Sequence, residues 1–83
     1  MKLVKNGIYR HYKGDYYLLL DVAYHSETLE KMVVYRALYD ECKCWVRPYD
    51  LFVEELDSKE YPNAKQKHRF ELQQVKSVKL EKV

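Results

Sequence analysis

The chain has 83 residues, of which 47% are apolar or aromatic, and its formal net charge is +2. A domain of this length buries only about 60% of the surface of its unfolded chain, so its core is small. Nine tyrosines, two phenylalanines and one tryptophan compensate, because each aromatic ring buries on the order of 150 to 250 Å². This composition excludes a chain that is disordered throughout.

The longest uninterrupted apolar run is the five residues 16–20. A membrane helix needs about 20 apolar residues and a secretory signal about 7 to 15, so we expect a cytoplasmic protein with no membrane partner. Two cysteines, Cys42 and Cys44, are too few for a disulfide framework. A bridge across the one residue between them would be strained in an extended strand, so we interpret both as reduced thiols.

The first half of the chain predicts strands joined by hairpins. Gly14 separates a β-rich run at residues 8–12 from a longer one at residues 16–24, which is typical of a hairpin with a short glycine-containing loop. A polar loop at residues 25–30 then leads into a strand at residues 32–39. After a turn that contains no glycine, residues 42–47 form a short strand of alternating side chains.

The second half is less regular. Pro48 favours an extended residue before it, and residues 49–52 have room for one helical turn, which we expect to be 3₁₀ with Phe52 in the core. A short extended run at residues 53–56 precedes a polar connection at residues 57–66. A last strand is expected at residues 68–72.

Five to six short strands in sequential hairpins predict an all-β protein, a small antiparallel sheet that is strongly bent and closed or nearly closed. A small SH3-like barrel with one 3₁₀ turn fits this pattern best. An α+β sheet with a C-terminal helix is the alternative.

The charges divide the chain into two parts. Residues 65–83 carry six basic and two acidic residues, a local net charge of +4. We therefore expect a single domain at residues 1–73 and a basic extension at residues 74–83, which either solubilises the chain or contacts an anionic partner.

Several blocks of sequence follow one another between about residues 7 and 70, at residues 7–14, 23–28, 33–39, 45–48 and 69–70. Their residues and order resemble the domain-of-unknown-function family DUF1653. The resemblance implies a small, independent, mainly bacterial domain with no established activity, and it implies no ligand. Two departures stand out: the extension at residues 73–83, and Asp21, where the resemblance implies a glycine at a bulge or a close backbone approach.

No catalytic motif is recognisable. His25, Ser26, Glu27 and Thr28 combine a base, a hydroxyl and a carboxylate, but near neighbours on one loop rarely reach the geometry of a triad. Loop capping by Ser26 or Thr28 is the ordinary interpretation. The histidines and the Cys-x-Cys pair lack the spacing of zinc sites, and two isolated glycines make no phosphate-binding loop. We therefore predict no enzyme, no cofactor and no metal site.

Paired aromatic and basic residues are the remaining signal. Tyrosine and arginine combine an apolar ring with polar donors, which suits either half-buried strands or a recognition surface. We predict a groove walled by Tyr12, His25, Trp45 and Arg47, with Arg10 and Arg36 supporting it through ion pairs. The full set of candidate binding residues is Arg10, Tyr12, Lys13, His25, Glu27, Arg36, Trp45 and Arg47.

Three functions remain open. The first is a non-enzymatic module that binds a protein or peptide, with Arg47 suited to a carboxylate and Trp45 to a flat ring or a proline. The second is single-stranded nucleic-acid binding, in which rings stack on bases and the basic extension contacts phosphates. The third is an enzyme using His25 and Glu27 at the mouth of a pocket. No part of the pattern requires a second copy of the chain.

Overall fold

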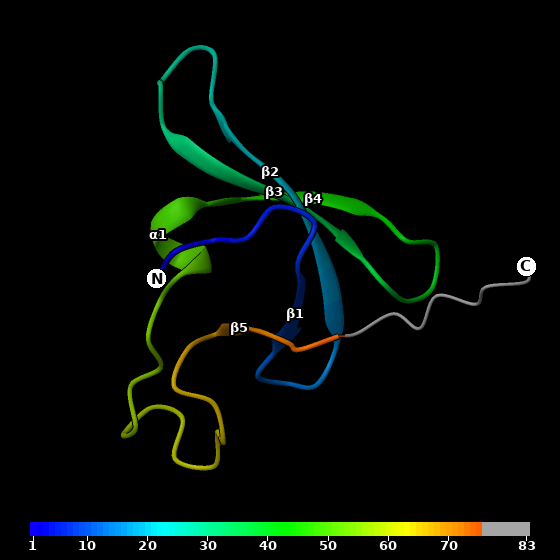
Figure 1. The fold of residues 1–83 in the computed structure, drawn as a ribbon. Helices are drawn as coiled ribbons and strands as arrows, with labels where there is room; N and C mark the ends of the chain where they lie inside the picture. Colours follow the sequence, from blue (N-terminus) through cyan, green and yellow to red (C-terminus); the bar gives the residue numbers. More distant parts are fainter. Residues whose placement is uncertain (76–83) are drawn as a thin grey trace, which may run out of the picture.

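The computed structural model describes residues 1–75, so most of the basic extension lies outside the described residues. The fold is mainly β, as predicted (Figure 1). Five antiparallel strands form one sheet in the order β4-β3-β2-β1-β5. The elements are β1 (Ile8–His11), β2 (Tyr16–Tyr24), β3 (Lys31–Ala37), β4 (Cys44–Pro48), α1 (Tyr49–Phe52) and β5 (Phe70–Leu72).

The sheet is open. Strands β4 and β5 are its two edges and do not pair with each other, so closure into an SH3-like barrel is not confirmed. The sheet is nonetheless strongly twisted, and the long β2–β3 hairpin projects away from the rest of the molecule (Figure 1). No helix within residues 1–75 is long and apolar enough to cross a membrane.

The hairpin turns explain where the strands end. Gly14 has a φ of 113°, which L side chains rarely adopt, and its N–H donates to the carbonyl of His11. The β3–β4 turn contains no glycine and uses Asp40 and Cys42 in left-handed conformations instead, with φ of 47° and 54°. Since a left-handed residue cannot continue a strand, β4 begins at Cys44, two residues later than expected.

A β-bulge interrupts the pairing of β2 with β3 between Leu19 and Asp21. Asp21 is exposed, its carboxylate accepts the N–H of Val22 at 2.8 Å, and it lies 3.6 Å from the Lys5 ammonium. Asp21 stands where the family resemblance implies a glycine, and its carboxylate therefore points to solvent beside the bulge.

The single helical turn differs from its prediction. The N–H of Val53 donates to the carbonyl of Tyr49, which is the spacing of an α-helix and not of the expected 3₁₀ turn. Phe52 at its end is fully buried, as predicted. Its ring stacks on that of Phe70 with centroids 4.1 Å apart.

Aromatic rings dominate the core, as the composition predicts. Tyr9 and Tyr35 meet the Phe52 ring edge to face, at 5.7 and 5.3 Å between centroids. Such pairs add about 0.5 to 1.5 kcal/mol each beyond the area they bury. The buried cluster comprises Tyr9, Leu19, Val33, Tyr35, Phe52 and Phe70.

The connection from α1 to β5 contains less strand than expected. Residues 53–56 form only an isolated bridge between Glu55 and His68, and β5 is confined to Phe70–Leu72. Backbone bonds hold the ends of this connection together, from Arg69 to Glu54 and from Leu56 to Lys67. The two ends of the connection, residues 54–56 and 67–69, therefore lie side by side.

Candidate functional site

The clearest hollow on the surface lies beside the β3–β4 hairpin. A pocket of about 580 Å³ there is continued by a smaller one of about 210 Å³, and both are lined by Tyr39 and Trp45. We call the two together the aromatic groove. The larger pocket is completed by Ala37, Asp40, Glu41 and Lys43, and the smaller by Tyr17, Tyr35 and Arg47.

Register explains why these side chains meet. Tyr35 pairs with Trp45 across β3 and β4, and Tyr17 pairs with Ala37 across β2 and β3. Directly paired residues share one face of a sheet. Ala37 is buried, and its small side chain leaves the space between the surrounding rings open as a pocket. Trp45 is 46% exposed at the rim, which places it at the surface and not in the core.

Arg47 is the cation of the groove. Its Nε donates to the Tyr35 hydroxyl at 3.2 Å, and its guanidinium carbon lies 5.3 Å from the centre of the Phe70 ring. No carboxylate of residues 1–75 lies within ion-pair distance of it. The contacts with Tyr35 and Phe70 therefore orient the guanidinium, while no carboxylate of residues 1–75 neutralises its charge.

Two tyrosine hydroxyls form a second polar feature of the groove. Tyr17 and Tyr39 lie 2.8 Å apart, oxygen to oxygen, with their rings edge to face. Burial, and then this hydrogen bond, raise the pKa of Tyr17 well above its ordinary value. Tyr17 therefore stays neutral at physiological pH, and the hydrogen-bonded pair offers a hydroxyl group to a ligand.

Cations gather at the end of the groove where His11 meets the Tyr17 ring, with centroids 6.5 Å apart. Burial, followed by the charges of Arg69, Arg47 and Lys13, lowers the pKa of His11 from 6.5 to about 4. The Nδ1 of His11 accepts the backbone N–H of Lys13 at 3.2 Å, which also favours the neutral ring. The charges of Arg69, Arg47 and Lys13 thus converge on this end of the groove, whereas Asp40 and Glu41 line the other end.

Of the predicted groove walls, only Trp45 and Arg47 line the same pocket. Tyr12 packs instead against Tyr61, with centroids 5.2 Å apart, and the Arg69 guanidinium lies 5.6 Å from its ring centre. Lys13 is exposed, and its ammonium lies 5.9 Å from the centre of the Tyr12 ring. These residues form a separate patch of rings and cations at the end of β1.

His25 and Glu27 lie on the exposed β2–β3 turn, beyond the last pair of the ladder, Tyr24 with Lys31. That pair is itself four residues, or about 13 Å, along β3 from Tyr35. Nδ1 of His25 accepts the N–H groups of Glu27 and Thr28, each at 3.2 Å. The Thr28 hydroxyl accepts the N–H of Glu30 at 3.2 Å, which confirms the predicted loop capping. These side chains serve the turn and do not reach the aromatic groove.

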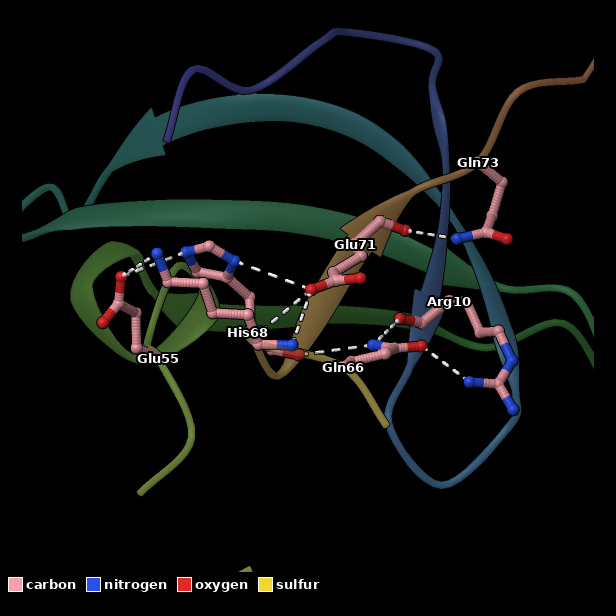
Figure 2. Close-up of polar contacts among 7 residues, drawn as sticks. Arg10, Glu55, Gln66, His68, Glu71 and Gln73 are labelled. Carbon is pink, nitrogen blue, oxygen red and sulfur yellow. Dashed lines mark hydrogen bonds and ion pairs between the residues drawn. The ribbon is translucent and has the colours of Figure 1, made fainter. Parts of the chain in front are cut away.

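Arg10 and Arg36 form hydrogen bonds where ion pairs were expected. Arg36 donates to the carbonyl of Cys42 at 2.9 Å and so closes the β3–β4 turn. Arg10 donates to the side-chain oxygen of Gln66 at 2.6 Å, and Gln66 donates back to the Arg10 carbonyl at 3.0 Å (Figure 2). No ion pair of either arginine occurs among residues 1–75.

A polar network at β5 was not foreseen from the sequence. The side chain of His68 is only 23% exposed and lies 3.7 Å from carboxylate oxygens of both Glu55 and Glu71 (Figure 2). One carboxylate oxygen of Glu71 also accepts the backbone N–H groups of Lys67 and His68. This network fastens the start of β5.

The eight candidate binding residues did not include Tyr17 and Tyr39, two of the rings that line the groove. The available signal was the alternation of Tyr35, Ala37 and Tyr39 along one strand, which puts a small residue between two rings on one face. The two cysteines, predicted to be reduced, are free and exposed.

Fold and groove together define a small, mainly β protein built on one open antiparallel sheet. The chain belongs to the family described as "Protein of unknown function (DUF1653)", whose model matches residues 7–72. A crystal structure of a DUF1653 protein from Bordetella bronchiseptica is similar at 36% sequence identity and a TM-score of 0.67, covering 94% of this chain and 95% of that one. No curated protein matches the chain significantly. The family implied by the sequence blocks is thus confirmed.

Proposed function

We propose that this protein is a small non-enzymatic binding module that recognises a protein or peptide segment through the aromatic groove. The observation that carries the proposal is a half-exposed Trp45 beside Arg47, a cation with no ion-pair partner in residues 1–75, in one hollow of the surface. Half-exposed rings supply contact area, and a guanidinium recognises a carboxylate through paired hydrogen bonds. The groove lies on the face of the sheet that also carries the buried Tyr35 and Ala37.

The test begins with a library of short random linear peptides displayed on phage and selected on the intact protein. Peptides that bind the wild type should bind Trp45→Ala about tenfold more weakly or worse, because the alanine removes a central anchor. The unfolding midpoint should change little, since Trp45 is half-exposed. Tyr24→Ala is the matched control, an exposed ring at the far end of β2 that should leave affinity unchanged.

Two results would contradict the proposal. One is unchanged affinity in Trp45→Ala, which would place the binding surface elsewhere. The other is loss of the fold in Trp45→Ala together with unchanged affinity in Arg47→Gln, since Arg47 then takes no part in recognition and Trp45 is a core residue.

Single-stranded nucleic acid is the second candidate ligand. The observation that favours it is the patch in which the Arg69 guanidinium lies 5.6 and 5.7 Å from the ring centres of Tyr12 and Tyr61. Binding of this kind weakens steeply as salt rises. Fluorescence anisotropy with labelled single-stranded RNA should then show that salt dependence, and deleting residues 74–83 should flatten it. An affinity indifferent to salt would exclude this candidate.

A further inference from the structure

Within the described residues 1–75, no strand pairs with the outer edge of β4. The N–H of Ala37 donates to the carbonyl of Lys43 at 2.9 Å, in the register that continues through the β3–β4 ladder. In an antiparallel ladder the main-chain groups of alternate residues point to opposite sides. Those of Cys44 and Val46 therefore point away from β3, and neither forms a further hydrogen bond within residues 1–75.

Pro48 limits this edge at one end. It pairs with Met32 and occupies the next outward-pointing position, where it has no N–H to offer. The open edge thus presents the donors and acceptors of two residues, Cys44 and Val46, and Val46 is 62% exposed. An unpaired edge of this kind is a template for one added strand.

The edge and the aromatic groove belong to one surface. Trp45 and Arg47 alternate with Cys44 and Val46 along β4, and their side chains line the groove. A strand added to the edge would carry every second side chain on the groove face, opposite Trp45 and opposite Arg47. The main chain of one extended segment can therefore form hydrogen bonds with the edge of β4 while its side chains occupy the groove.

We propose that the ligand is an extended acidic peptide segment that pairs antiparallel with β4 as an added strand. A carboxylate of the peptide pairs with Arg47, and an apolar side chain two residues further toward the peptide's C-terminus packs on Trp45. The acidic residue belongs at the Arg47 end, because Asp40 and Glu41 line the other end of the groove. This inference rests on the proposed peptide-binding function.

A second copy of the chain suits the edge less well. Antiparallel self-pairing of β4 centred on Trp45 would place Arg47 of one copy opposite Lys43 of the other. Like charges directly opposite across a ladder are destabilising. In this register, which pairs Cys44 of one copy with Val46 of the other, charge complementarity favours an acidic segment over a second β4.

The experiment compares Val46→Pro with Val46→Ala in the full chain, using the peptides selected on the wild type as probes. Proline removes the outward N–H but no bond of the β3–β4 ladder, and it is tolerated in edge strands. Val46→Pro should weaken peptide binding about tenfold or more, through the lost donor and the clash of its ring, while Val46→Ala should stay within about threefold. The unfolding midpoint and the amide spectrum report whether each variant folds.

A second measurement needs no protein variant. N-methylation of the peptide residue between the carboxylate and the apolar side chain should also weaken binding about tenfold, because that amide faces the Val46 carbonyl. N-methylation one residue to either side should have little effect.

The outcomes separate the two proposals. If selected peptides depend on Trp45 but ignore both Val46→Pro and N-methylation, groove binding stands and strand addition is wrong. If the chain forms a dimer that Val46→Pro dissolves, the edge serves a second copy instead and the inference is wrong. If no peptide can be selected, both proposals fail.

Discussion

Arg47 and His11 show how single residues set the electrostatics of this surface. Arg47 is held by Tyr35 and Phe70, and no carboxylate of residues 1–75 neutralises it. His11 lies near enough to it that the arginine charge, after burial and Arg69, helps to keep the ring neutral. Positive charge therefore accumulates beside the aromatic groove, although the whole chain carries only +2.

A pH dependence of stability follows from His11. Its pKa is lowered from 6.5 to about 4 in the folded chain, so between these values the unfolded chain binds the additional proton. The free energy of unfolding should therefore fall as the pH is lowered from 6.5 toward 4, with no contribution from His11 at higher pH. His11→Gln should flatten this part of the profile, measured by urea unfolding at a series of pH values.

Imidazole nitrogen chemical shifts provide the direct check. The His11 ring should remain neutral at pH 5.5, midway through the range that its lowered pKa defines. A ring that gains its proton near pH 6.5 in the folded protein would refute the electrostatic account, whatever the unfolding data show.

At the scale of elements, the long connection between α1 and β5 contains no strand of the sheet, and side-chain hydrogen bonds attach it to β1 and β5. Gln66 accepts from Arg10 and donates to the carbonyls of Arg10 and His68, at 3.0 and 3.2 Å (Figure 2). Glu71 accepts backbone N–H groups at the start of β5. These bonds give a polar segment with little secondary structure a defined path across β1.

Replacing Gln66 tests this account. Gln66→Ala removes three hydrogen bonds and leaves partly buried groups without their partner, which should cost about 1 to 3 kcal/mol. Lys65→Ala, at the exposed neighbouring position, should change the free energy of unfolding by less than about 0.5 kcal/mol.

The readouts are urea unfolding and amide hydrogen exchange. Exchange should accelerate in residues 64–69 of Gln66→Ala, while the β2–β3 hairpin keeps its protection. Equal stability of the two variants would mean that the connection is held by its backbone bonds alone.

At the scale of the whole molecule, the two edges of the sheet have different positions in the chain and different surroundings. The edge strand β4 follows a tight turn and stays open beside the groove, whereas β5 arrives from a long connection and pairs with β1. Gln73 completes that pairing by donating its N–H to the carbonyl of Ile8 at 2.8 Å. Among residues 1–75, Gln73 is thus the last residue whose backbone bonds to the sheet.

A chain that ends at Gln73 should therefore fold. Its unfolding midpoint should match that of the full chain, because residues 1–73 contain every strand and every buried-cluster residue of the part of the chain that the structure describes. A chain that ends at Arg69 lacks β5 and the buried Phe70, and it should lose cooperative unfolding. Thermal unfolding followed by circular dichroism distinguishes the two. A marked loss of stability in the chain that ends at Gln73 would show that the extension belongs to the domain.

The sequence by itself determined the features that depend on neighbouring residues. Strand β2 was predicted from Tyr16 to Tyr24 because its apolar run is bounded by the Gly14 turn and a polar loop, and Phe52 was placed in the core because Pro48 leaves room for one turn only. Alternation alone put Trp45 and Arg47 on one face of β4. Only the tertiary structure decided the features that depend on pairing between distant segments. It places Tyr17 opposite Ala37 beside the groove, and His25 far from the groove. It also pairs β5 with β1, while the outer edge of β4 has no partner strand within residues 1–75. Register between strands is set by the packing of the whole core, and no local pattern specifies it.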